Sequence, residues 1–321
     1  MTVDFYYNEG PRGVLGLGRL NLGDLLCSPS SYFKLESDTR TVIIGGGIQS
    51  NYITGEERPP DGYDKVVVWG GGLSSHPQKA LQSGIDGLDV WTIRDREIVP
   101  SVQHWLPCVS CMHPMLDHPA VESVPGRSLL YVNADPVIYS PSALMKSRKI
   151  ATEHGLDFCT NRADERDFFD MWHKCERVVT NSYHGIYWSL LAGKEVVVFG
   201  YNFKFTSVLS MFGLGNKIIT FEKRDRAKLE AATREAVAGQ NTVCLPDAAK
   251  VLGEYREMQR RFAQRLVEQH IILSFSQTTY VKNFIRPKSN SREIKRILAE
   301  YIGATDRRLS GIAQRIKPRR G

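Results

Sequence analysis

The segment at residues 178–185 holds the side chain best suited to proton chemistry, His184. Its sequence, Val-Val-Thr-Asn-Ser-Tyr-His-Gly, is a β-branched run that ends in polar residues, a histidine and a glycine. A helical stretch over 186–192, a break at Gly193 and a second apolar strand over 195–199 are expected to follow. This order predicts that His184 lies at the carboxyl end of a parallel strand, beside a helix amino terminus that can bind an anion. The segment therefore indicates an enzyme that acts on a phosphorylated substrate.

Polar residues at two other turns are suited to binding an anionic or polar substrate. Arg94 and Asp95 follow an apolar strand expected at 89–93, and an arginine there can hold a carboxylate or phosphate through two parallel hydrogen bonds. A surface pair between Arg94 and Asp95 is the competing interpretation. Asn21 and Asp24 flank a turn at which a helix begins. They are interpreted either as a helix cap at Asp24 or as polar groups at the rim of a cleft.

Two glycine triplets, at 45–47 and 70–72, end similar apolar strands. A dinucleotide site would need a carboxylate at the end of the next strand, but the strand after the first triplet ends in the second triplet. This disfavours a nicotinamide cofactor. Two alternatives remain: backbone amides that contact a phosphate or carboxylate, and glycines that are required for tight turns.

The six cysteines are expected to be reduced thiols rather than a disulfide framework. Cys108, Cys111 and His113 are spaced closely enough to suggest zinc, but a structural site needs four ligands and no second Cys/His pair of suitable spacing follows. Buried thiols in a turn anchored by Pro107 and Pro114 are the preferred interpretation, and no metal is expected.

Short apolar runs alternate with helical periodicity along most of the chain. The predicted strands lie at 3–7, 41–44, 65–69, 89–93, 128–133, 177–180 and 195–199. The predicted helices lie at 142–154, 164–175, 226–238, 248–270 and 291–302. This alternation predicts an α/β fold with two Rossmann-like domains that face a cleft. The expected divisions are an N-terminal domain at 1–120, a C-terminal domain with a helical end at 127–285, and a basic helix and tail at 286–321.

Charge is distributed unevenly over the chain. Residues 281–321 carry twelve Lys or Arg and three Asp or Glu, a net charge of +9, which leaves −2 for residues 1–280 of the total of +7. A tail exposed to solvent is the default expectation, with attraction to an anionic membrane surface as the alternative. No nucleic-acid partner is expected.

The composition and the apolar runs limit the class of protein. A hydrophobic content of 42% is sufficient for packed cores. The longest apolar runs are strand-sized, against the roughly 20 residues of a membrane-spanning helix, and no secretory signal is recognised in residues 1–30. We therefore expect a cytoplasmic location, at the inner face of the membrane if the basic tail binds there.

In their order and spacing these motifs resemble those of the polysaccharide pyruvyl transferase family, over roughly residues 15–220. The motifs are Asn21-Leu22-Gly23-Asp24, the strand that ends in Gly45-Gly46-Gly47, Trp69-Gly70-Gly71-Gly72 with Ser74, Arg94-Asp95, and Ser182-Tyr183-His184-Gly185 with Lys204. The stretch at 105–117 is similar to a segment of one exopolysaccharide-associated branch of the family.

The resemblance implies a fold like the B-type glycosyltransferases and a ketal-forming reaction. The enolpyruvyl unit of phosphoenolpyruvate would be transferred to sugar hydroxyls of an exopolysaccharide or its lipid-linked precursor, with release of phosphate. His184 matches the histidine of the family's Arg-Leu-His-Gly motif and is the expected catalytic residue, and Lys204 matches a lysine that follows the next strand. Phosphoenolpyruvate is then a donor substrate, and no cofactor is expected.

The sequence departs from the family pattern at Ser182, which stands where the family has an arginine. If that arginine binds an anionic group of the donor, another cation must replace it, and Arg94 and Lys204 are the candidates. The other predicted substrate contacts are Asn21, Asp24, Gly46, Gly47, Gly71, Gly72, Ser74, Ser75, Ser182 and Tyr183.

Two other functional classes fit the same architecture. The first is a glycosyltransferase that uses a nucleotide sugar, although no carboxylate pair suited to ribose and sugar hydroxyls is recognised in the second domain. The second is a polysaccharide-assembly protein that keeps the fold without catalysis, which the loss of the arginine at Ser182 would permit.

Overall fold

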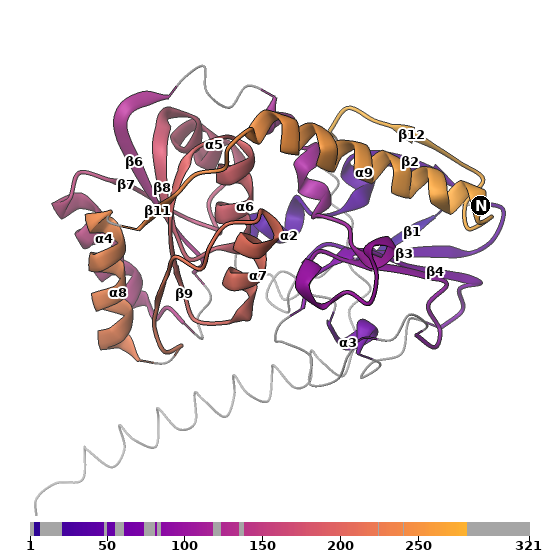
Figure 1. Ribbon diagram of the computed structural model, residues 1–321, viewed down its shortest axis with the longest axis horizontal. Coiled ribbons are helices and arrows are strands. Elements are labelled where there is room, and N and C mark those ends of the chain that lie inside the picture. Colours follow the sequence, from indigo (N-terminus) through magenta and orange to yellow (C-terminus); the bar gives the residue numbers. More distant parts are fainter. Residues whose placement is uncertain are drawn as a thin grey trace, which may run out of the picture.

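The computed structural model (Figure 1) describes most of the chain up to residue 280. The described residues are 3–6, 21–47, 50–54, 61–73, 81, 85–117, 123–134, 138–223, 225–239 and 241–280. The helix expected at 291–302, the basic tail, and the predicted contacts Ser74 and Ser75 lie outside them.

The N-terminal part forms a parallel sheet in the strand order β1-β3-β4-β5. Its strands are β1 (Asp4–Tyr6), β3 (Thr41–Gly45), β4 (Lys65–Gly71) and β5 (Val90–Ile93). β3 is buried along its whole length, as expected for a parallel strand that is covered on both faces. The strands expected at 3–7, 41–44, 65–69 and 89–93 are therefore confirmed, although residue 7 lies outside the described residues.

The second sheet has the order β10-β9-β8-β6-β7, and β11 pairs with β9 as an antiparallel edge. Its strands are β6 (Val124–Val132), β7 (Asp157–Thr160), β8 (Cys175–Thr180), β9 (Glu195–Gly200), β10 (Ile218–Thr220) and β11 (Thr242–Val243). The strands β7, β10 and β11 were not predicted, because they are too short to stand out as apolar runs. The other three were predicted, although β6 begins four residues before the expected strand.

Helices cover both faces of the second sheet (Figure 1). They are α4 (Pro141–Glu153), α5 (Glu165–Lys174), α6 (Tyr183–Leu191), α7 (Phe203–Met211) and α8 (Arg226–Ala238). Along β6, Leu130 packs in one core with α4 and α8, while Leu129 packs in another with α5 and α6. Successive strand residues face opposite sides of a sheet, so a continuous apolar run supplies both cores. The α/β class with parallel sheets is confirmed.

The chain returns to the N-terminal sheet through the long helix α9 (Ala248–Glu268), which lies along the top of Figure 1. Strand β12 (Ser274–Gln277) then pairs antiparallel with β2 (Phe33–Glu36). The side chain of Gln259 on α9 accepts a hydrogen bond from Trp69 Nε1 at 2.7 Å and donates one to Pro107 O at 2.7 Å. The end of the predicted second domain therefore packs against the first sheet.

The remaining short elements lie in the N-terminal part. They are the helices α2 (Leu22–Leu25) and α3 (Ser50–Ile53), and the 3₁₀ turns η1 (Pro29–Ser31), η2 (Arg96–Ile98), η3 (Val102–His104), η4 (Val109–Met112) and η5 (Pro114–Leu116). One buried cluster includes Ile43 and Trp69 of the first sheet together with Leu129 and Tyr131 of the second. The two sheets thus share a core. Among the described residues, every helix is too short or too polar to cross a bilayer.

Candidate active site

Arg94 and His184 follow strands of different sheets and lie next to each other. Arg94 directly follows β5, and His184 lies in α6 just after β8. Arg94 Nη1 is 3.4 Å from His184 Nε2, and the two residues are only 4% and 5% exposed. A permanent cation and a group able to transfer protons therefore share a buried site, contributed by opposite halves of the chain.

His184 lies in the first turn of α6 rather than in the turn before it. The helix was expected to begin at residue 186, but it begins at Tyr183. Ser182 caps it, because its hydroxyl accepts a hydrogen bond from Gly185 N at 3.4 Å, as side chains at this position commonly do. Stacking on Trp188, with ring centroids 5.2 Å apart, fixes the orientation of the imidazole. Ser182 therefore positions His184 through the helix start.

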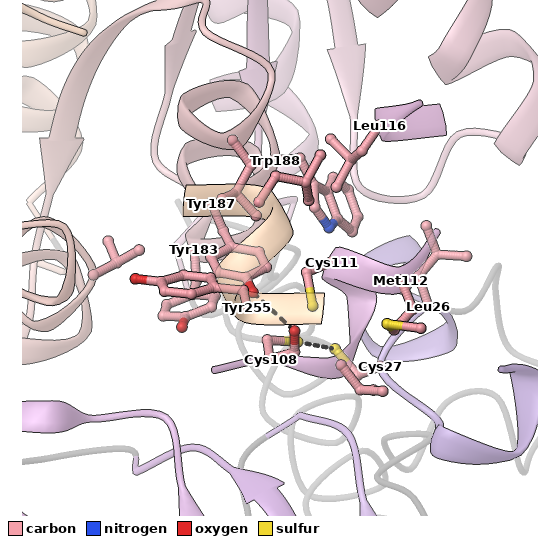
Figure 2. Close-up of a cluster of buried hydrophobic side chains, with 14 of the residues drawn as sticks. Leu26, Cys27, Cys108, Cys111, Met112, Leu116, Tyr183, Tyr187, Trp188 and Tyr255 are labelled. Atoms are coloured by element: carbon pink, nitrogen blue, oxygen red, sulfur yellow. Dashed lines mark hydrogen bonds between the residues drawn. The ribbon is translucent and has the colours of Figure 1, made fainter. Parts of the chain in front are cut away.

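Two cysteines also contact the imidazole. Cys27 Sγ lies 2.9 Å from His184 Nε2, and Cys108 Sγ lies 3.7 Å from the same atom. The two sulfurs are 3.3 Å apart (Figure 2). Cys27 was not predicted as a site residue, although it lies three residues after Asp24 and hence close to the same face of a helical turn. Cys108 was considered only as a partner of Cys111 and His113.

The ionisation of the two thiols is linked. Burial, followed by the contact with Cys108, raises the pKa of Cys27 well above its usual value. Burial acts in the same direction on Cys108, but hydrogen bonds from Cys27 and His184 and the charge of Arg94 lower its pKa well below the usual value. The contact between the two sulfurs therefore acts on their pKa values in opposite directions.

Three glycines leave the space that these side chains occupy. A Cβ atom added to Gly23 would lie 2.0 Å from His184 Nδ1, and one added to Gly72 would lie 2.5 Å from Arg94 Nη2. A Cβ on Gly46, whose φ is +82°, would lie 3.1 Å from the Cβ of Cys27. The glycines at the strand ends were expected to bring backbone amides to a ligand or to form tight turns. In the structure Gly46 and Gly72 leave room for the side chains of Cys27 and Arg94.

Arg94 is buried with unused hydrogen-bonding capacity. Its guanidinium carbon lies 3.7 Å from the centroid of the Tyr183 ring, and its Nε has no partner among the described residues. Burial alone would lower the pKa of Arg94, but Tyr183, Cys108 and Asp95 reverse this effect and raise it. A buried donor without an acceptor costs free energy, so an anion bound here would be stabilised.

Two carboxyl groups lie close to the cation. Asp95 is buried, accepts hydrogen bonds from Ser207 Oγ at 2.5 Å and Leu73 N at 2.8 Å, and is not a surface partner of Arg94 as the competing interpretation had it. Asp24 accepts a hydrogen bond from Asn21 Nδ2 at 2.9 Å. Burial raises the pKa of both carboxyls, and Arg94 opposes the rise. Asn21, not Asp24, caps the short helix α2.

The other predicted contacts surround this centre at different distances. Lys204 lies in the first turn of α7, where its Nζ donates to Tyr201 Oη at 3.1 Å and its charge acts on the pKa of Asp24. Gly47 accepts a hydrogen bond at its carbonyl from Gly72 N at 3.0 Å, and Gly71 accepts one from Arg94 N at 3.0 Å. These backbone bonds join the ends of β3, β4 and β5.

The closely spaced Cys108, Cys111 and His113 do not form a common metal site. His113 Nδ1 accepts a hydrogen bond from Met115 N at 3.1 Å, and its Nε2 lies 3.5 Å from Glu165. Cys108 instead groups with Cys27 and His184, the one set of three potential metal ligands found among the described residues. A separate hollow between α4 and α8, lined in part by Lys146, contains none of the predicted site residues.

No known family model matches the sequence, and no curated protein sequence matches it. Two of the solved structures with some similarity are a spinosyn rhamnosyltransferase, SpnG, complexed with thymidine diphosphate, and the glycotransferase of kitacinnamycin. The first is 11% identical, with a TM-score of 0.34 over 71% of this chain and 67% of that one. The second is 13% identical, with a TM-score of 0.29 over 65% of this chain and 55% of that one. Scores this low do not assign the fold, which rests on the strand order described above.

Proposed function

We propose that the chain is a transferase that moves the enolpyruvyl unit of phosphoenolpyruvate onto sugar hydroxyls of an exopolysaccharide or its lipid-linked precursor. The proposal is supported by the convergence of motifs that lie far apart in the sequence. A Cβ on Gly23 would overlap His184, one on Gly72 would overlap Arg94, and Asp24 lies within electrostatic reach of His184, Arg94 and Lys204. A resemblance that rested on unrelated short matches would not be expected to place them together.

The observation that carries the proposal is the buried Arg94 beside His184. Arg94 Nη1 is 3.4 Å from His184 Nε2, and Arg94 Nε has no acceptor among the described residues. Phosphoenolpyruvate carries a carboxylate and a phosphate, both of which an arginine can bind through paired hydrogen bonds. In this proposal Arg94 takes the role of the arginine that Ser182 replaces, and Lys204 adds a second cation.

In the proposed reaction His184 provides the proton that the donor requires. The imidazolium would protonate the methylene carbon of phosphoenolpyruvate while a sugar hydroxyl attacks C2. A second hydroxyl would then attack C2 as phosphate departs, which closes the ketal. One hydroxyl proton returns to the imidazole and the other leaves with phosphate. Histidine is suited to both proton transfers, and Arg94 would stabilise the negative charge on the departing phosphate.

The test is release of phosphate from phosphoenolpyruvate in the presence of a polysaccharide repeat as acceptor. His184→Gln is expected to reduce kcat by a factor on the order of 100 or more. Arg94→Lys is expected to raise KM for phosphoenolpyruvate, because lysine cannot form the paired contacts. The matched control is Arg96→Lys, two residues away on the exposed start of η2, which should leave both constants unchanged.

A nucleotide sugar is the competing donor, and thermal unfolding distinguishes the two. Phosphoenolpyruvate should raise the melting temperature of the wild type and of Arg96→Lys, and should have a smaller effect on Arg94→Lys. If only nucleotide sugars stabilise the protein and no phosphate is released, glycosyl transfer would replace pyruvyl transfer as the proposed function. Absence of any donor effect would favour the non-catalytic class.

A further inference from the structure

Three soft ligand atoms from distant parts of the chain meet next to the proposed active site. They are Cys27 Sγ, Cys108 Sγ and His184 Nε2, at mutual separations of 3.3, 2.9 and 3.7 Å. Cys27, Cys108 and His184 are 1%, 2% and 5% exposed. Each contributes one atom that binds metals well, and a cluster of two thiols and an imidazole suits a borderline-soft ion such as zinc.

The surrounding structure holds each ligand in place. Tyr187 Oη donates to the carbonyl of Cys108 at 2.8 Å (Figure 2). Trp188 stacks on the imidazole of His184, and Gly46 lets the backbone of Cys27 approach β3 closely. Ligands from three separate segments, fixed by packing, are what a preorganised metal site requires.

The size of the cluster fits a zinc ion after small movements. With Zn–S near 2.3 Å and Zn–N near 2.05 Å, tetrahedral ligands lie about 3.8 Å apart for two sulfurs and about 3.6 Å apart for sulfur and nitrogen. The 3.3 Å between the sulfurs and the 2.9 Å between Cys27 Sγ and His184 Nε2 would therefore widen by less than about 1 Å.

The charges of the site also permit an ion. Two thiolates balance the charge of Zn²⁺, so binding would leave the existing charges of Arg94, Asp24 and Asp95 as they are. The guanidinium of Arg94, 3.4 Å from His184 Nε2, repels the ion and should weaken its binding without preventing it. The protein would supply three ligands and leave a fourth position for water or an anion.

We propose that Cys27, Cys108 and His184 form a zinc-binding site with two thiolates and one imidazole nitrogen as ligands. The proposal does not rest on pyruvyl transfer. Zinc would occupy the lone pair of Nε2, and an imidazole bound to zinc in this way cannot be the imidazolium of the proposed transfer. The zinc-bound form and the proton-transferring form of His184 therefore exclude each other.

The test is binding of Zn²⁺ and Co²⁺ to the full chain, purified with a chelator and kept in a phosphine reductant so that both thiols remain reduced. The wild type should bind one zinc ion per chain, and Co²⁺ should give thiolate charge-transfer absorption with visible bands of tetrahedral cobalt. Cys27→Ser, Cys108→Ser and His184→Gln should each lose more than about tenfold in affinity, since even changes beyond the ligands cost about that much.

The matched control is Cys111→Ser, which alters a buried thiol on η4 that lies outside the cluster. It should bind zinc as the wild type does, and Arg94→Gln should bind it several-fold more tightly. Thermal unfolding identifies any variant that fails to fold, and the cobalt spectrum of the wild type does not depend on the variants. Absence of stoichiometric binding, a cobalt spectrum without thiolate bands, or equal binding by all folded variants would overturn the site. None of these measurements uses phosphoenolpyruvate, so they leave the proposed transfer to its own test.

Discussion

At the scale of single residues, Gly72 determines where the guanidinium of Arg94 lies. A methyl group on Gly72 would lie within 2.5 to 2.7 Å of three guanidinium atoms, which is too close for the arginine to keep its place. Gly72→Ala is therefore expected to displace Arg94 by about 1 Å and to lower kcat/KM for phosphoenolpyruvate by a factor on the order of 100. Steady-state phosphate release measures this loss.

The control for Gly72→Ala is Gly215→Ala, since a Cβ there meets no atom within 4 Å. This variant should match the wild type in activity. If Gly72→Ala were as active as Gly215→Ala, Arg94 would not be the cation that binds the donor.

The ring of His113 makes stability depend on pH in a predictable direction. Burial lowers the pKa of His113, although Glu165, with Asp117, opposes this and Arg256 adds to it. The pKa of this histidine in the unfolded chain is about 6.5. Below that pH the unfolded chain binds a proton at His113 more readily than the folded chain does. The free energy of unfolding should therefore fall as the pH drops through that value.

The variant His113→Asn keeps an acceptor for Met115 N and removes the titrating ring. Urea unfolding at pH 7 and pH 5 should show a larger loss of stability for the wild type than for this variant. Equal losses of stability in the wild type and in His113→Asn would mean that His113 is protonated equally in the folded and unfolded chain.

At the scale of elements, the start of α6 positions the ring of His184. Ser182 accepts one long hydrogen bond, at 3.4 Å from Gly185 N, so Ser182→Ala should cost about 0.5–1 kcal/mol of the free energy of unfolding. The same change should lower phosphate release, because His184 lies in the turn that the cap fixes. Chemical unfolding and kinetics measure the two effects.

The N-terminal cap of α8 provides the control for Ser182→Ala. Asp225 accepts hydrogen bonds from Ala227 N and Lys228 N at 3.0 Å each, and Asp225→Ala should cost about 1 kcal/mol. Because α8 covers the opposite face of the sheet, activity should be unchanged. Equal losses of activity in the two variants would attribute the effect of Ser182→Ala to stability alone.

At the scale of the whole molecule, Gln259 on α9 joins the C-terminal half of the chain to the N-terminal half. This side chain is fully buried and satisfies both the indole of Trp69 and the carbonyl of Pro107. Gln259→Met should leave these two buried groups unpaired and cost about 2–6 kcal/mol, from about 1–3 kcal/mol for each. Gln264→Met, on the exposed side of the same helix, should change the unfolding midpoint little. Similar unfolding midpoints for the two variants would mean that the hydrogen bonds of Gln259 do not hold the two halves of the chain together.

The sequence predicted the elements of the sheets well where apolar runs are long. The strands at residues 41–44 and 195–199 were located from hydrophobicity alone, because buried parallel strands are continuously apolar. The pairing of β2 with β12 was not predicted, since it joins residues 33–36 to residues 274–277. Such contacts between distant residues leave no local pattern in a single sequence.

The sequence by itself determined which side chains carry charge and titratable groups, and which glycines and caps allow each turn. His184 and Arg94 were identified in this way, because their types and their places after apolar strands are local properties. The tertiary structure alone decided that Cys27 and Cys108 lie against His184, 157 and 76 residues apart in the chain. It did so because a shared core holds both sheets in one arrangement, and that arrangement brings together side chains that no spacing along the sequence relates.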